Sequence, residues 1–177
     1  MILKWRLATE NDFSAINAIA LQIHPQLPER PDVMAEKQRL FPEGCLVLAS
    51  ALIISGYALS HPWKCNKIPA LNELLWQLPK NPDCLYLHDI ALLPNARGHR
   101  ASRQLVETLI EIAYKEKLSF LALTSVYDTR GLWESYGFKP YKNIHIDHQI
   151  NTYGPTATYM IKSLQGLDQP HAEASLS

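Results

Sequence analysis

The spacing of apolar residues near the N-terminus predicts a strand followed by a helix. Residues 3–8 alternate between apolar and polar side chains, which is typical of a strand with one buried face. Thr9 and Asp12 have the spacing of a capping box, so a helix is expected to begin there. The apolar side of this helix consists of Phe13, Ile16, Ile19, Ala20 and Ile23, and its end is expected at the His24-Pro25 pair.

The next part of the chain combines strand-forming segments with a long irregular stretch. A weaker helix is expected over residues 34–41. Residues 45–60 are rich in Val, Ile, Leu and Tyr, which predicts two strands joined near residues 49–51. Residues 61–83 contain four prolines, so we expect an excursion from the core that includes one short helix over residues 71–78.

The second half carries the clearest periodicity. A strand is expected over residues 84–92, and Pro94 ends it. A helix from residue 101 to about residue 117 follows, because Leu105, Leu109 and Ala113 continue one apolar stripe. The remaining expected elements are a strand at 120–126, a short helix at 129–136, and strands at 142–147 and 157–163.

This order of elements predicts one domain over residues 1–164 and a disordered tail over residues 165–177. Neighbouring strands can run in both directions in such an order. We therefore predict an α/β fold in which helices flank a mixed, mostly antiparallel sheet of six to seven strands.

Composition and charge exclude several classes of protein. The 177 residues are 47% apolar and 19% charged, as in a globular domain, and their net charge of zero disfavours nucleic-acid and membrane partners. The cysteines Cys45, Cys65 and Cys84 lack the spacing of a redox pair or a zinc site, so no metal is expected. Without a signal sequence or an apolar run of about 18 residues, a cytoplasmic protein is expected.

A basic loop precedes the longest predicted helix and is a candidate anion site. Helix starts present unpaired N–H groups and the positive end of the helix dipole. Arg97 and Arg100 add positive charge at this place, and Gly98 keeps the backbone open. The alternative is an ordinary solvated connection.

Three segments in the expected order resemble the GNAT family of N-acetyltransferases. The family's strand, loop and helix motif is matched by Leu92, Pro94, Arg97, Gly98, Ser102 and Leu105. Residues 131–138 resemble the family's aromatic ending before Gly-Phe, and residues 56–58 resemble its third strand. Together the matches extend over about residues 3–163.

The resemblance implies acetyl-CoA as cosubstrate, with its pantetheine arm in an opening between the fourth and fifth strands. Backbone groups of Ala91, Leu92 and Leu93 would contact the pantetheine. The residues that would line the pyrophosphate are Arg97, Gly98, His99, Arg100, Ala101 and Ser102. Two of them depart from the family, because Arg100 stands at a usual glycine and Ser102 at a glycine or alanine. Arg100 either obstructs the loop or pairs with a phosphate.

Acyl transfer to an amine requires a neutral amine, a stabilised oxyanion and a proton for the thiolate, but no metal. His88 resembles the histidine that removes the amine proton in the aralkylamine branch, with a structural histidine as the alternative. Strand alternation would place His88, Ile90 and Leu92 on one face and Asp89, the reserve base, on the other. The family's tyrosine acid is replaced by Trp133, which leaves Tyr136 as candidate acid or as a packing residue. Alternatively, the thiolate leaves without enzymatic help.

The leading functional hypothesis is an N-acetyltransferase acting on a small-molecule amine or a peptide N-terminus. One alternative is a GNAT-fold module that binds or senses CoA without catalysis, which the departures at Arg100 and Trp133 suggest, and another is a scaffold domain that has lost cofactor binding. Trp63, Trp76 and Tyr57 are candidates for the wall of the acceptor pocket, although a packing flap explains the 61–83 excursion equally well. Family resemblance also allows a homodimer.

Overall fold

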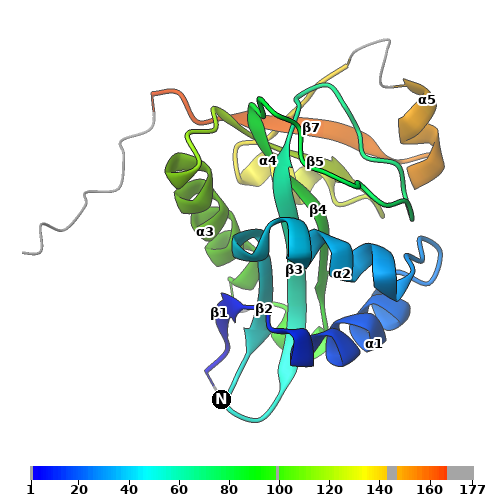
Figure 1. Ribbon diagram of the computed structural model, residues 1–177, viewed down its shortest axis with the longest axis vertical. Coiled ribbons are helices and arrows are strands. Elements are labelled where there is room, and N and C mark those ends of the chain that lie inside the picture. The colour runs from blue at the N-terminus through cyan, green and yellow to red at the C-terminus, as the bar shows by residue number, and fades with distance from the viewer. Residues whose placement is uncertain (1, 99, 143–146, 167–177) are drawn as a thin grey trace, which may run out of the picture.

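A seven-stranded mixed sheet forms the centre of the computed structural model, which describes residues 2–98, 100–142 and 147–166 (Figure 1). The strand order is β1-β2-β3-β4-β5-β7-β6, and every pairing is antiparallel except that of β4 with β5. The strands are β1 Lys4–Leu7, β2 Cys45–Ala49, β3 Ile54–Trp63, β4 Cys84–Leu92, β5 Phe120–Ser125, β6 Lys139–Pro140 and β7 Thr158–Ser163. The predicted fold class is confirmed.

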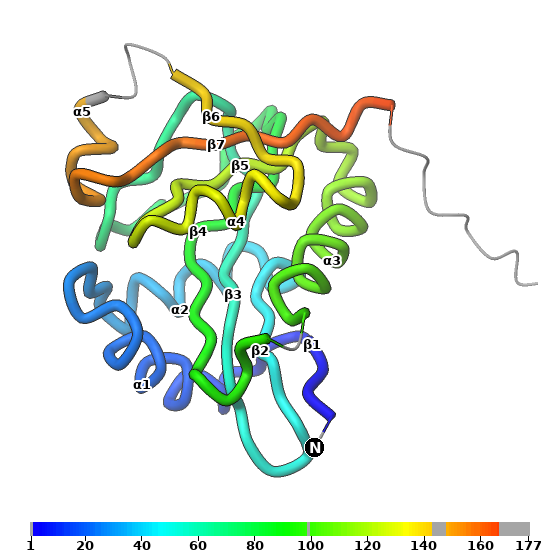
Figure 2. Tube along the Cα trace, turned by 180° about the vertical axis from the view of Figure 1, so that it is seen from behind, coloured from blue at the N-terminus to red at the C-terminus, as the bar shows by residue number. Residues whose placement is uncertain are grey.

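Helices cover both faces of this sheet. Helices α1 (Phe13–Ile23) and α2 (Pro31–Leu40) lie on one face, whereas α3 (Ala101–Lys115) lies on the other (Figures 1 and 2). The shorter helices are α4 (Arg130–Ser135) and α5 (Asp147–Ile150), and single 3-10 turns occupy Glu10–Asp12, Pro42–Gly44, Pro94–Ala96 and Asn151–Tyr153. No helix of the described residues has the length and apolar character that crossing a membrane requires.

The start of α1 confirms the predicted capping arrangement. The carboxylate of Asp12 accepts a hydrogen bond of 2.7 Å from the backbone N–H of Thr9 and is paired with Arg6 at 2.7 Å. Ile16 and Ile19 are buried against β2 and β3. Capping therefore fixes where the helix begins, and burial of its apolar side holds it on the sheet.

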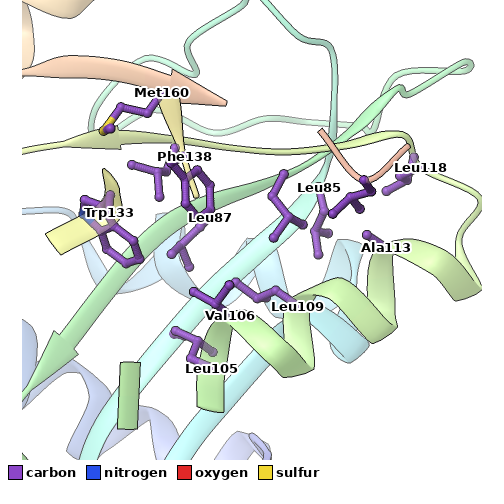
Figure 3. Packing of buried hydrophobic residues seen from close by; sticks show 14 of the residues in the cluster. Leu85, Leu87, Leu105, Val106, Leu109, Ala113, Leu118, Trp133, Phe138 and Met160 are labelled. Carbon is purple, nitrogen blue, oxygen red and sulfur yellow. The ribbon is translucent and has the colours of Figure 1, made fainter. Parts of the chain in front are cut away.

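The apolar stripe of α3 packs on the strands that position the site. Leu105, Val106 and Leu109 lie against Leu85 and Leu87 of β4, and all five are buried (Figure 3). The same cluster includes Trp133, Phe138 and Met160. Each such side chain contributes about 1.5–3 kcal/mol of transfer free energy, so α3 is held rigidly beside the end of β4.

The helix predicted over residues 71–78 is wrong. Asn72 and Trp76 have φ values of 59° and 62°, which a right-handed helix does not contain. The N–H groups of Leu75 and Trp76 instead donate to the carboxylate of Glu36 in α2, at 2.7 and 2.9 Å. A distant carboxylate therefore replaces the local helical hydrogen bonds.

Two other expectations depend on segments that the structure does not fully describe. Residues 143–146, inside the strand expected at 142–147, lie outside the described residues, as does most of the expected tail, residues 167–177. Besides β5, β7 pairs with β6, which lies slightly earlier in the chain than the expected strand, and Asp147 belongs to α5.

The parallel strands β4 and β5 separate halfway along their length. They pair from Cys84 to Leu87 of β4 and from Phe120 to Leu123 of β5. Beyond Leu87, β4 continues to Leu92 along β3, whereas the end of β5 pairs only with β7. In Figure 2, β4 runs down the centre while β5 and β7 cross near the top. The expected opening between these two strands is therefore present.

Candidate active site

A cavity of about 580 Å³ occupies the opening between β4 and β5. Side chains from α1, β4, β5, α3, α4 and the connecting loops line it. Its lining includes Ile23, His24, Leu27, Glu29, Leu71, Leu87, His88, Asp89, Ile90, Leu92, Arg97, Gly98, Ser102, Leu123, Thr124, Val126, Tyr127, Thr129, Leu132, Trp133 and Tyr153. A basic loop lies at one end, and a group of carboxylates and imidazoles lies at the other.

A β-bulge in β4 sets the direction of the polar side chains. Leu59 of β3 pairs with Asp89 and the next residue, Ser60, pairs with Leu87, so His88 has no partner in the register. The predicted alternation is therefore wrong for His88, which shares the side of Asp89, whereas Asp89 does lie opposite Ile90 and Leu92 as predicted. Ile90 packs in the α3-side cluster with Leu87, while Asp89 and His88 both point toward side chains of the α1 and α2 face.

The basic end of the cavity is the predicted anion loop. Arg97, Gly98 and Ser102 line the cavity, and Ser102 belongs to the first turn of α3. Gly98 has a φ of 77°, which favours glycine, and the space where a Cβ would stand is open. The positive end of the α3 dipole and the guanidinium of Arg97, whose Nε donates to the carbonyl of Leu92 at 3.4 Å, therefore lie at this end of the cavity.

Arg100 adopts the left-handed conformation that the family's usual glycine would favour. Its φ is 56° and its ψ is 17°, and its side chain is exposed. A side chain in this region costs about 1–2 kcal/mol, so the loop keeps its shape at some expense in stability. The exposed guanidinium does not line the cavity among the described residues. His99, another predicted contact, lies outside the described residues.

The other predicted cofactor contacts divide between the cavity and the core. Leu92 lines the cavity. Ala91 is buried toward α1, and the N–H of Leu93 donates to the carbonyl of Ser55 at 2.9 Å. Ala101 is buried, and its carbonyl accepts a hydrogen bond of 2.9 Å from the indole of Trp5. These three residues hold the loop in position.

A buried charge cluster occupies the far end of the cavity. The Nε2 atom of His88 lies 3.0 and 3.2 Å from the two carboxylate oxygens of Glu29, and Lys37 Nζ lies 3.9 Å from the same carboxylate. Their side chains are 1%, 5% and 0% exposed, respectively. Burial raises the pKa of Glu29, but the charges of His88 and Lys37 lower it to about 2. Glu29 is therefore a buried carboxylate that stays ionised.

A second group surrounds Asp89. Its Oδ2 accepts a hydrogen bond of 2.5 Å from the hydroxyl of Tyr57, and its Oδ1 lies 3.1 Å from Nε2 of His24. Because that Nε2 also lies 3.0 Å from the carbonyl of Ile90, both neighbours accept, and the proton belongs on Nε2. Burial lowers the pKa of His24, but the hydrogen bond and charge of Asp89 raise it above its ordinary value.

Of three aromatic side chains near the site, two line the cavity and one lies behind it. Tyr127 lines it and stacks on His24, with ring centroids 5.6 Å apart. Trp133 also lines it, and its indole donates to the hydroxyl of Thr129 at 3.2 Å. Tyr136 is not among the described lining residues, and its hydroxyl shares a hydrogen bond of 2.8 Å with Ser102. Tyr136 is therefore connected to the cavity only by its hydrogen bond to Ser102.

The excursion after β3 contributes to the wall through an unexpected residue. Leu71 lines the cavity, whereas Trp76 is 78% exposed and Trp63 packs in a separate cluster. Tyr57 is not among the described lining residues, but its hydroxyl donates to Asp89, which lines the cavity. The excursion is attached to the acidic end because the N–H of Asn72 donates to Glu29 at 3.0 Å.

Sequence reasoning missed His24, Glu29 and Tyr127. His24 stands at the break that ends α1, and Glu29 lies among prolines in the connection to α2, where sequence alone signals only a turn. Tyr127 follows β5 with a φ of 52°, and no local pattern marks it. Only the approach of these segments to β4 reveals them.

Comparisons with known proteins identify the same fold and family. A family model described as the acetyltransferase (GNAT) family matches residues 15–138. A GphF GNAT-like decarboxylase in complex with isobutyryl-CoA is 15% identical, with a TM-score of 0.73 and coverage of 92% of this chain and 100% of that one. The ribosomal-protein-S18-alanine N-acetyltransferase from Escherichia coli is 19% identical, with a TM-score of 0.64 and 99% of each chain covered. Ard1 from Thermoplasma volcanium is 13% identical, with a TM-score of 0.70 and coverage of 92% of this chain and 98% of that one. No curated protein sequence matches the chain.

Proposed function

Because the chain belongs to the acetyltransferase (GNAT) family, we propose that it transfers an acetyl group from acetyl-CoA to a primary amine of a small molecule or a peptide N-terminus. One observation carries this proposal. A single cavity connects a cationic helix start to a group of carboxylates and imidazoles, past the free edge of β4. The two ends have the chemistry that a diphosphate and an amine require.

The cosubstrate would bind along β4 and the start of α3. Arg97, Gly98 and Ser102 line the cavity and would hold the pyrophosphate. The edge of β4 beyond Leu87 is not paired with β5, and the pantetheine amides would lie along it, with Leu92 nearest the loop. On this edge the carbonyl of Ile90 lies 3.0 Å from His24 Nε2, and the carbonyl of Leu92 accepts from Arg97 Nε at 3.4 Å. The backbone N–H of Leu92 is our proposed donor to the oxyanion, as the family resemblance implies.

The reaction consists of proton removal, attack and departure of the thiolate. The ammonium of the acceptor loses one proton to the enzyme, and its nitrogen lone pair then attacks the thioester carbonyl. A C–N bond forms and the C–S bond breaks, so the products are an amide and the thiolate of CoA. The attacking nitrogen gives up a second proton as the amide forms, and the thiolate takes up one proton to become the thiol. The proton first removed from the ammonium passes to solvent, so the enzyme returns to its starting charge.

We propose that Asp89 provides the proton acceptor and that His88 supports it. The Asp89 side chain is 17% exposed and lines the cavity, while His24 and Tyr57 hold both of its oxygens. His88 lines the cavity as well, but its Nε2 faces Glu29. This geometry favours direct contact of the ammonium with Asp89 and a supporting role for His88.

The proton for the thiolate would come from Tyr136 by way of Ser102. The two hydroxyls are 2.8 Å apart, and Ser102 lines the cavity. Trp133, at the family's usual tyrosine position, carries an indole N–H that is already bonded to Thr129 and is a poor acid.

Thiol release from acetyl-CoA with a panel of amines tests this proposal. We expect release with at least one amine, and we expect Asp89→Asn to lower kcat by about 100-fold or more, as removal of a positioned proton acceptor does. Release with no amine would refute catalysis.

A non-catalytic CoA-binding function is the second candidate, and the strained Arg100 favours it. Calorimetry separates the two. CoA binding without any thiol release would support the binding module, whereas thiol release that Asp89→Asn abolishes would exclude it.

A further inference from the structure

Two cysteines and a carboxylate meet at the base of the excursion after β3. Cys65 follows the end of β3, Asp83 directly precedes β4, and Cys84 is the first residue of β4. One ligand atom from each residue, the two Sγ atoms and a carboxylate oxygen, lies within 4.8 Å of the other two. In the part of the chain that the structure describes, no other three His, Cys, Asp or Glu side chains come together in this way. The fold thus assembles a group of potential metal ligands.

Hydrogen bonds of the backbone hold the three residues in this arrangement. Trp63 pairs with Cys84 in the register of β3 and β4, and the N–H of Asp83 donates to the carbonyl of Trp63 at 3.0 Å. The N–H of Cys65 in turn donates to Oδ1 of Asp83 at 2.6 Å. Because the chain is fixed on both sides of the group, binding of an ion would require little further ordering.

The spacing and the kind of ligand atom fit zinc. A cysteine sulfur lies about 2.3 Å from Zn²⁺, so two sulfurs of a tetrahedral site are about 3.8 Å apart. The separation of at most 4.8 Å exceeds that value by about 1 Å or less, which small side-chain rotations can close. Thiolates favour Zn²⁺ over Mg²⁺ and Ca²⁺, which prefer oxygen ligands. Cys84 is buried, whereas Cys65 and Asp83 are half-buried and leave a solvent side for the ion and for a water as fourth ligand.

Lys64 balances the charge of such a site. Its Nζ lies 3.5 Å from Oδ2 of Asp83, and the two side chains are 37% and 41% exposed. An exposed ion pair of this kind is weak, so the carboxylate can turn from the ammonium to a metal. Two thiolates and a carboxylate carry one negative charge more than Zn²⁺ neutralises, and the ammonium of Lys64 offsets that charge.

We propose that Cys65, Asp83 and Cys84 bind one Zn²⁺ ion, which joins the two ends of the excursion over residues 64–83. Both thiols release their protons to solvent as the Zn–S bonds form. None of the three lines the cavity among the described residues, so the inference does not rest on the proposed acyl transfer. The ion would hold in place the segment that gives Leu71 to the cavity wall and the N–H of Asn72 to Glu29.

Titration of the reduced, metal-free protein with Co²⁺ tests this proposal. Co²⁺ occupies tetrahedral zinc sites and absorbs in the near ultraviolet by charge transfer when thiolates bind it. We expect this absorption to saturate at one Co²⁺ per chain, to disappear when Zn²⁺ displaces the cobalt, and to persist when Mg²⁺ is added.

Variants link the binding to its residues. Cys65→Ser should weaken Zn²⁺ binding about 100-fold or more in competition with a chelator, because one of the two soft ligands is lost. Asp83→Asn keeps an oxygen for the N–H of Cys65 and should weaken binding about 10-fold, and it decides the matter if Cys65→Ser does not fold. Cys45→Ala is the matched control, because Cys45 is buried in a different cluster, and it should leave the affinity unchanged.

Four results would overturn the inference. Saturation with Co²⁺ without charge-transfer absorption would place the ion on other side chains, such as histidines. Absorption that is retained in both Cys65→Ser and Asp83→Asn, or lost in Cys45→Ala, would remove the site from these residues. A reduced protein that binds no Co²⁺ but forms a Cys65–Cys84 disulfide in air would contain a redox pair instead.

Discussion

Replacement of Glu29 by glutamine tests the buried charge cluster quantitatively. The substitution keeps the shape of the side chain and removes the charge that His88 contacts at 3.0 Å and Lys37 approaches at 3.9 Å. Burial raises the pKa of Glu29, but these two neighbours lower it from the ordinary 4.5 to about 2. The carboxylate thus binds its proton more weakly in the folded protein than in the unfolded chain.

The size of the effect follows from this difference in pKa. A tenfold change in proton affinity corresponds to about 1.4 kcal/mol, so ionised Glu29 contributes about 3 kcal/mol to the free energy of unfolding near pH 7. Because the pKa of Glu29 is lower in the folded protein, this contribution is fully present above pH 4.5 and is lost as the pH falls toward about 2. Near pH 3 about 1 kcal/mol should remain.

Urea unfolding of both proteins at the two pH values measures this contribution. We expect Glu29→Gln to be less stable than the parent by about 3 kcal/mol near pH 7 and by about 1 kcal/mol near pH 3. Glu107→Gln serves as control, since its side chain is exposed on α3. Equal losses at both pH values, or no loss near pH 7, would show that the carboxylate is not held by its charged neighbours.

Three further substitutions test other parts of the structure. Gly56→Ala would bring a Cβ to within 2.6 Å of Leu92 Cδ2 and 2.8 Å of the Ala91 carbonyl, and we expect a loss of about 1–3 kcal/mol in urea unfolding. Arg100→Gly relieves the left-handed backbone at φ 56° and should raise stability by up to about 1 kcal/mol, and calorimetry should show whether the side chain also contributes to CoA affinity. Burial lowers the pKa of His24, but Asp89 raises it by more, so the pKa is higher in the folded protein than in the unfolded chain. The pair therefore stabilises the fold at low pH, and this stabilisation is lost as the pH rises through the folded pKa. His24→Asn should therefore cost more stability near pH 5 than near pH 9, and an equal cost at both pH values would contradict the pairing.

Elements with strong periodicity could be predicted from the sequence. The strand at 84–92 and the helix beginning at residue 101 were found because their apolar residues repeat with one clear period and end at turn signals. The segment at 71–78 also has a helical pattern. Its backbone N–H groups bond to Glu36, so a tertiary contact overrides the local preference.

The site was predictable only where it follows a local motif. Arg97, Gly98, Ser102, His88 and Asp89 line the cavity as parts of one continuous segment. The bulge at His88 was not predictable, because it depends on the register with β3. The same limit applies to cysteines: Cys65 and Cys84 are far apart in sequence, yet together with Asp83 they place ligand atoms within 4.8 Å of one another.

A crystal structure of the protein with CoA tests the central claim most directly. We predict the pyrophosphate against Arg97, Gly98 and Ser102 and the thiol between β4 and β5, close enough to Asp89 for an amine to contact both. CoA bound at another surface, or a crystal grown with saturating CoA in which this cavity contains only solvent, would contradict the account.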